Sequence, residues 1–224
     1  MTVVDIIQND PEVPIGVFGE LLEEWRLTFR LVRLNAGDSL PVGAGAVIVL
    51  GGAMGVHDEA LHPFLRPLKE FLARRLIAGT PLLGICLGGQ LLASLAGGVV
   101  SSKCRGEQGL VEVSLTSSGL SDPLFSGIGQ RFEAFQWHND SFSIPSVALH
   151  LAASDACPGQ AFRAGNAWGL QFHPEVDRGL VAAWSGKTAA HTTLTTEFAA
   201  VETAHRALAR QLLANFLTIA NHLS

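Results

Sequence analysis

The stretch PLLGICLGGQLLASLAGG, residues 81–98, decides between two fold classes for this sequence. It lies in a longer run, residues 76–102, that contains no charged side chain. A membrane-spanning helix needs about 20 mostly apolar residues in a row. Pro81 and repeated glycines interrupt this run, and each glycine costs a helix interior about 1 kcal/mol relative to alanine. The stretch is therefore predicted to be a buried strand, residues 82–85, followed by a buried helix, residues 88–96.

The N-terminal part of the chain alternates between strand and helix patterns. Apolar runs at residues 3–7 and 46–50 are predicted strands, and the second is the continuous type that parallel sheets bury on both faces. Residues 14–31 and 63–78 carry apolar side chains at helical spacing, although residues 28–34 suit a strand equally well. This alternation predicts an α/β fold in three layers, with a mostly parallel central sheet between helices.

The C-terminal half predicts a different arrangement. Four strands are expected there, at residues 109–115, 148–153, 161–163 and 167–172, with turn material between the first two. The last two read as a hairpin around Gly165 and Asn166, so this half is predicted to add antiparallel strands to the sheet margin. Residues 198–223 predict a long amphipathic helix. The threonine-rich segment 188–196 is expected to be a mobile loop.

The composition restricts the possible partners. The chain has 224 residues, 48% hydrophobic and 16% charged, which suits a single domain over residues 1–224. A net charge of −5 offers no basic surface to nucleic acid. Cys86, Cys104 and Cys157 have neither the spacing of a zinc site nor an even disulfide framework. Since the N-terminus also lacks a basic targeting region, we expect a cytoplasmic protein without nucleic-acid or membrane partners.

Cys86 lies where the predicted strand 82–85 turns into the predicted helix. Gly84 and Gly88 flank it two residues away on either side, a pattern typical of a nucleophile elbow. The start of the helix directs free N–H groups and its positive dipole end toward the thiol, which favours a thiolate and binds an oxyanion. The alternative is a small cysteine that only packs in the core. The flanking glycines favour the nucleophile.

A cysteine nucleophile needs a base, and His173 is the best candidate. It ends the predicted strand 167–172, so it is expected at the same sheet edge as Cys86. Glu175 follows two residues later, and side chains two apart in an extended chain point the same way. Its carboxylate is thus expected to accept a hydrogen bond from the imidazole and orient it. Nucleophile, base and orienting acid are all present.

Two motifs in this order resemble the class I glutamine amidotransferase family. They are GICLGGQ at residues 84–90 and QFHPE at residues 171–175, and Gly51-Gly52 after a buried strand resembles the oxyanion loop of that family. The resemblance extends over roughly residues 3–176. It implies a flavodoxin-like three-layer architecture and hydrolysis of a glutamine or γ-glutamyl amide, with no cofactor.

The resemblance also implies a role for each matching residue. Cys86 would attack the amide carbon and form a thioester, while His173 moves protons and Glu175 orients His173. The backbone N–H groups of Gly52 and Leu87 would stabilise the oxyanion.

Substrate contacts are implied for the residues that match more loosely. Gln90 lies one helical turn after Cys86 and would contact the bound glutamine. Trp137, Asn139 and Asp140 would close over its α-amino and carboxylate groups, whereas His138 is taken as a loop residue. Lys103 and Glu107 are expected at the surface. No metal site is expected.

The oxyanion loop departs from the common family pattern, because GGAMG stands at residues 51–55 in place of Gly-Gly-Pro-x-Ser. This resembles stand-alone members akin to the amidotransferase domain of GMP synthase, some of whose relatives are γ-glutamyl peptidases. Neither a Walker A motif nor a pyrophosphatase loop is present. One alternative is therefore a partner-gated or idle subunit that supplies ammonia to a separate synthetase. Another is an α/β-hydrolase, but there the acid precedes the histidine, unlike Glu175 here.

Overall fold

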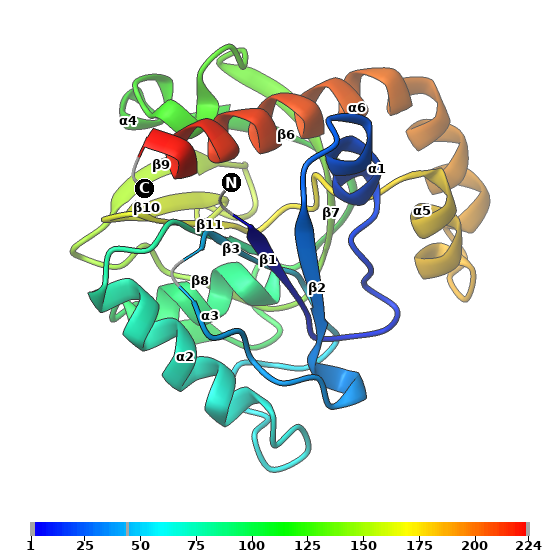
Figure 1. Cartoon of the computed structure of the whole chain (residues 1–224). Helices are drawn as coiled ribbons and strands as arrows, with labels where there is room; N and C mark the ends of the chain where they lie inside the picture. Colours follow the sequence, from blue (N-terminus) through cyan, green and yellow to red (C-terminus); the bar gives the residue numbers. More distant parts are fainter. Residues whose placement is uncertain (1–2, 44, 223–224) are drawn as a thin grey trace.

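The computed structural model describes residues 3–43 and 45–222, and its centre is a nine-stranded sheet (Figure 1). The strand order is β2-β1-β3-β4-β11-β10-β9-β6-β7. The parallel strands are β1 (Val4–Gln8), β2 (Phe29–Arg33), β3 (Val47–Val49), β4 (Leu82–Ile85) and β11 (Ala167–Leu170). The antiparallel extension consists of β10 (Ala161–Ala164), β9 (Leu149–Ala153), β6 (Glu107–Leu115) and β7 (Arg131–His138). The predicted α/β class and antiparallel margin are confirmed.

Helices cover both faces of the sheet (Figure 1). Helices α2 (Leu65–Ile77) and α3 (Leu87–Leu95) lie on one face, and α1 (Val17–Glu24) and α6 (His191–His222) lie on the other. Helix α5 (Arg178–Ser185) packs beside α6. The remaining elements are the 3₁₀ turns η1 (Leu34–Ala36) and η2 (Pro123–Phe125), helix α4 (Ser117–Leu120), and a two-stranded sheet of β5 (Val100–Ser101) and β8 (Ser141–Phe142). Among the described residues, no helix has the length and apolar character to cross a membrane.

Strand β3 shows why the central strands are uniformly apolar. Its side chains alternate between the two faces of the sheet. Ile48 packs in the core beneath α1 and α6, while Val47 and Val49 pack in the core beneath α2 and α3. All three are fully buried. A parallel strand covered on both faces has no position for a polar side chain, so the continuous apolar run predicted it correctly.

The first predicted helix is wrong at its C-terminal end. Helix α1 stops at Glu24 rather than at residue 31, and Arg26 follows with a φ of +55°. Residues 29–33 instead form β2, which pairs in parallel with β1 from Phe29 to Arg33. Phe29 and Leu31 suited either structure, and pairing with β1 decided for the strand.

Two further predictions are wrong. The segment expected to be turn material contains β7, which pairs antiparallel with β6. Charged and amide side chains masked this strand's pattern; Gln136, for example, is fully buried because its amide donates to Gln160 Oε1 at 2.9 Å. The expected loop 188–196 contributes the first turn of α6, where Thr195 donates to the carbonyl of His191 and Leu194 packs inward. The predicted last residue of this helix, Leu223, lies outside the described residues.

Candidate active site

The turn at Cys86 is strained and tightly packed. Cys86 has φ +50° and ψ −108°, a conformation that non-glycine residues rarely adopt. A Cβ atom at Gly84 would come within 2.4 Å of the backbone of Gly88, and one at Gly88 would lie 2.2 Å from the carbonyl oxygen of Val49. These glycines therefore allow α3 to approach β3 and β4 closely enough to hold Cys86 above the sheet edge.

Cys86 borders a pocket of about 670 Å³ at the carboxyl ends of the parallel strands. Open α/β sheets usually bind ligands at this edge. The walls come from the loop after β1 (residues 10–14), the loop after β3 (residues 52–54), the start of α3, the end of β7 and helix α5. Of the residues predicted for the site, those lining the pocket are Gly52, Cys86, Gln90, Trp137, Asn139, Asp140 and His173.

His173 and Glu175 form a buried pair behind the pocket. His173 Nδ1 lies 2.7 Å from Glu175 Oε1, and the two side chains are 3% and 0% exposed. The His173 backbone N–H donates to the carbonyl of Phe135 at 2.8 Å, which fixes the strand end to β7. His173 Nε2 is buried without a hydrogen-bond partner among the described residues. A Cβ atom at Gly51 would meet His173 Cε1 at 3.2 Å and Cys86 Cβ at 3.5 Å, so imidazole and thiol flank the same glycine.

The charge state of His173 follows from these neighbours. Burial by itself lowers the pKa of His173, but the negative charges of Glu175 and Cys86 outweigh it and raise the pKa to about 10. His173 therefore carries a proton at neutral pH, next to the cysteine sulfur. That arrangement suits a group that donates a proton to a leaving amine.

Leu87 directly follows Cys86 at the start of α3 and is buried. Its side chain approaches the loop after β3, because a Cβ atom at Gly52 would lie 3.1 Å from Leu87 Cδ2. The loop itself is held by Asp10, whose carboxylate accepts from the backbone N–H of Ala53 at 3.0 Å. The sequence did not single out Asp10; its position two residues after β1, at the carboxyl edge of the sheet, was the available signal.

Two further contacts were missed. The Gln171 side-chain amide donates a weak hydrogen bond to Cys86 Sγ at 3.6 Å. Gln171 is the first residue of the QFHPE motif, so the motif contacts the thiol directly. The Trp184 ring packs edge-on against His173 with ring centroids 5.0 Å apart, and its Nε1 donates to the carbonyl of Glu12 at 2.7 Å. No sequence signal connected Trp184 to His173, because the position of α5 depends on tertiary packing, including its packing on α6.

The amide group of Gln90 is already engaged within the protein. Its Nε2 donates to the carbonyl of Asp140 at 3.2 Å and to Gln171 Oε1 at 3.4 Å. The Oε1 atom is left to accept a hydrogen bond from a ligand. Gln90 thus joins the elbow helix to the segment after β7.

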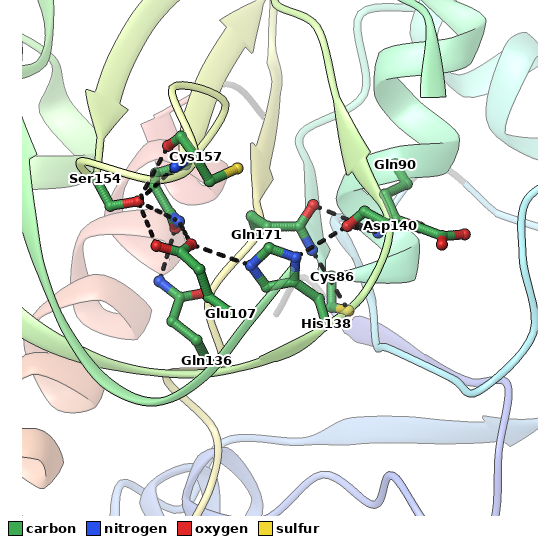
Figure 2. A network of polar contacts seen from close by, with 10 residues as sticks. Cys86, Gln90, Glu107, Gln136, His138, Asp140, Ser154, Cys157 and Gln171 are labelled. Atoms are coloured by element: carbon green, nitrogen blue, oxygen red, sulfur yellow. Dashed lines mark hydrogen bonds and ion pairs between the residues drawn. The ribbon is translucent and has the colours of Figure 1, made fainter. Parts of the chain in front are cut away.

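A second set of cysteine, histidine and glutamate lies close by (Figure 2), and its His138 also lines the pocket. Glu107, His138 and Cys157 are buried, with potential ligand atoms within 4.8 Å of one another. The predictions of His138 as a loop residue and of Glu107 at the surface are therefore wrong. Both Glu107 oxygens already accept hydrogen bonds, from Ser154 Oγ at 2.6 Å and Gln160 Nε2 at 2.5 Å. These bonds satisfy the carboxylate without a metal ion.

Cys157 differs from Cys86 in the properties that matter for a nucleophile. Its side chain is 0% exposed and does not line the pocket. Burial, reinforced by the nearby Glu107 charge, raises the pKa of the Cys157 thiol to about 11. A thiol in this state is neither a good nucleophile nor a good metal ligand. Of the two cysteines, only Cys86 reaches a ligand-sized cavity.

His205 on α6 is buried beside the segment that carries His173 and Glu175, and its burial predicts that the fold is sensitive to acid. Both its ring nitrogens are buried without partners among the described residues. Burial lowers the pKa of His205 to about 4, although the Glu175 charge opposes this shift. The unfolded chain therefore binds more protons between about pH 4 and 6.5, and stability falls as pH drops through this window.

We expect His205→Leu to remove most of this acid penalty. The wild-type protein should lose about 2 kcal/mol of unfolding free energy between pH 7.5 and pH 5 through this group. Urea unfolding at pH 5 and pH 7.5 measures the difference for both proteins. The exposed His57→Leu variant is the control and should keep the wild-type pH dependence. An equal acid loss in His205→Leu and wild type would contradict the assignment.

Comparisons with known proteins agree with this geometry. The family model described as glutamine amidotransferase class-I matches residues 21–181. The chain is 30% identical over 167 residues to the glutamine amidotransferase-like protein YfeJ of Salmonella typhimurium, covering 71% of this chain and 70% of that protein. It is 36% identical over 137 residues to a glutamine-hydrolysing GMP synthase subunit of Picrophilus torridus, covering 60% and 69%. A solved glutamine amidotransferase from Thermotoga maritima matches with a TM-score of 0.87 at 28% identity, covering 96% of this chain and 97% of that one.

Proposed function

Because the chain belongs to the class I glutamine amidotransferase family, we propose that it hydrolyses the side-chain amide of glutamine or of a γ-glutamyl compound. The catalytic residues in this proposal are Cys86, His173 and Glu175. The observation that carries the proposal is the arrangement at the pocket edge. There the strained Cys86 faces a buried His173, whose Nδ1 lies 2.7 Å from Glu175 Oε1. A positioned nucleophile, base and orienting acid are the parts that covalent amide hydrolysis requires.

The proposed reaction has two steps. The Cys86 thiolate attacks the amide carbon, and the C–N bond breaks as His173 Nε2 gives its proton to the leaving nitrogen. This step yields a γ-glutamyl thioester and releases ammonia or an amine. His173 then takes a proton from water, whose oxygen attacks the thioester, and glutamate leaves as the thiolate is restored. The N–H groups of Gly52 and Leu87 would stabilise the negative oxygen in both steps.

The remaining pocket residues suit the amino-acid end of the substrate. Asp140 supplies a carboxylate for the α-amino group, and Gln90 Oε1 is free to accept from it. Asn139 and Trp137 complete this wall. Lys187, at the opposite side near α5, offers a cation for a carboxylate. In this proposal the chain works as one domain over residues 1–224.

The pocket volume supports substrates larger than glutamine. A water molecule takes about 30 Å³ in the liquid, so the ten non-hydrogen atoms of glutamine fill at most about 300 Å³ on that scale. The pocket holds about 670 Å³. Trp184, Leu180 and Ala183 give the pocket an apolar wall, and the Trp184 ring packs against His173. A γ-glutamyl amide with an amine substituent is accommodated there.

The similarity to a GMP synthase subunit favours one alternative, in which the chain delivers ammonia to a separate synthetase. In that case, the pocket residues act only after a partner docks. Assaying the purified chain with and without proteins captured from its own cells separates the two forms of the proposal. Strong glutaminase activity of the chain alone would exclude gating. The three free cysteines suit the reducing cytoplasm in either case.

A glutamine-analogue electrophile is expected to label Cys86 and to leave Cys157 unmodified. The reason is that Cys86 borders the pocket, whereas Cys157 is fully buried with a raised pKa. Mass mapping of the modified peptide measures the site, and competition by glutamine and a panel of γ-glutamyl amides ranks the substrates. Labelling that glutamine does not slow, or labelling centred on Cys157, would overturn the proposal.

A further inference from the structure

His138 lies between two hydrogen-bond acceptors (Figure 2). Its Nδ1 is 2.9 Å from the carbonyl oxygen of Asp140, and its Nε2 is 3.2 Å from Glu107 Oε2. The His138 and Glu107 side chains are 1% and 5% exposed. Because a carbonyl accepts only, Nδ1 must donate to Asp140. The other ring nitrogen, Nε2, then faces Glu107 Oε2.

Glu107 is anchored on the side away from the pocket. Ser154 Oγ donates to one of its oxygens at 2.6 Å, and Gln160 Nε2 donates to the other at 2.5 Å. Gln136 in turn donates to Gln160 Oε1. Glu107 begins β6 and His138 ends β7, and the two residues face each other in the antiparallel register. The imidazole is thereby held through residues of β6 and of the segment after β9.

Asp140 is the point where this anchor reaches the pocket wall. Its carbonyl accepts from His138 and also from Gln90 Nε2 at 3.2 Å. Its Oδ1 accepts from the backbone N–H of Lys103 at 2.9 Å. The segment that follows is tied by the short pairing of β8 with β5. A small displacement of the Asp140 carbonyl would therefore move both Asn139 and the Gln90 amide.

We propose that His138, oriented by Glu107, is a positioning residue that sets the substrate-binding wall formed by Asn139, Asp140 and Gln90. This inference rests on the proposed function for the role of that wall. His138 acts through the Asp140 carbonyl and has no part in the chemistry at Cys86. The predicted signature is weaker substrate binding at nearly constant turnover.

The test compares two variants that differ only in the clamp, the hydrogen bond from His138 to the Asp140 carbonyl. Glu107→Gln alone keeps the His138 donor to the Asp140 carbonyl, and it is the matched control. Adding His138→Leu removes that donor without leaving an unpaired buried charge. The double variant should raise the KM for glutamine about tenfold or more over the control, with kcat within about threefold, as expected for losing a buried hydrogen bond. Adding His138→Asn in place of leucine restores a donor near the Nδ1 position and should recover most of the loss.

Hydrogen exchange supplies a readout that needs no activity. In the double variant, amides in residues 100–103 and 139–142 should exchange at least about tenfold faster than in Glu107→Gln, whereas those of β4 should be unchanged. If wild type shows no hydrolysis, the proposed function fails and the exchange result still decides the clamp. Unchanged exchange in both segments, a fall in kcat at constant KM, or no recovery by His138→Asn would each overturn the positioning role.

Discussion

Replacing Cys86 by alanine is expected to lower kcat for glutamine hydrolysis at least about 10³-fold, because removal of a nucleophile leaves only binding and oxyanion stabilisation. The side chain lies at the pocket edge on a strained turn, and its sulfur accepts a weak hydrogen bond from Gln171. Steady-state ammonia release measures the loss. Thermal unfolding should change little, since the substitution removes a single non-hydrogen atom.

Cys157→Ala is the matched control for this experiment. Cys157 is also buried, but its hydrogen bonds with Ser154 use its backbone N–H and carbonyl, which alanine keeps. Its activity should stay within about threefold of wild type, because no reacting group is removed. Activity that survives in Cys86→Ala and disappears in Cys157→Ala would transfer the catalytic role to the buried cluster around Glu107.

Replacing Glu175 by glutamine is expected to lower kcat/KM by about 10²–10⁴-fold, as for other orienting acids of catalytic triads. The Glu175 carboxylate holds His173 Nδ1 at 2.7 Å and is fully buried. An amide of the same shape keeps the packing but loses the charge. Because burial lowers the pKa of His173 and Glu175 is the strongest influence raising it, the pKa falls well below about 10 in the variant.

The pH profile distinguishes this cause from a loss of folding. In wild type, His173 stays protonated across neutral pH; in Glu175→Gln it loses its proton as pH rises through the lowered pKa, so the residual rate should be higher at pH 6 than at pH 8. The control is Glu202→Gln, which removes an exposed carboxylate paired with Arg178 on the surface. A Glu175→Gln enzyme with the wild-type rate and profile would remove Glu175 from the mechanism.

The parts of the fold that sequence predicted are those in which local pattern and tertiary environment agree. Strand β4 has the predicted bounds, and β3 lies inside its predicted apolar run. Both strands are covered on two faces, so every position is buried and none carries a charged or polar side chain. Residues with mixed environments were misread: β7 carries exposed Arg131 and Glu133 beside buried Phe135 and Gln136. Its identity as a strand depends on pairing with β6.

By itself, the sequence determined the α/β class, the elbow at Cys86, and the pairing of His173 with Glu175. These are local features: glycines at a turn, an apolar run, and two side chains two residues apart. Tertiary structure alone decided that Glu107 lies against His138, 31 residues away, and that Trp184 packs on His173. Such contacts are set by strand register and by the packing of α5 and α6. These bring together residues that are far apart in the chain, and the sequence around each residue does not indicate its partner.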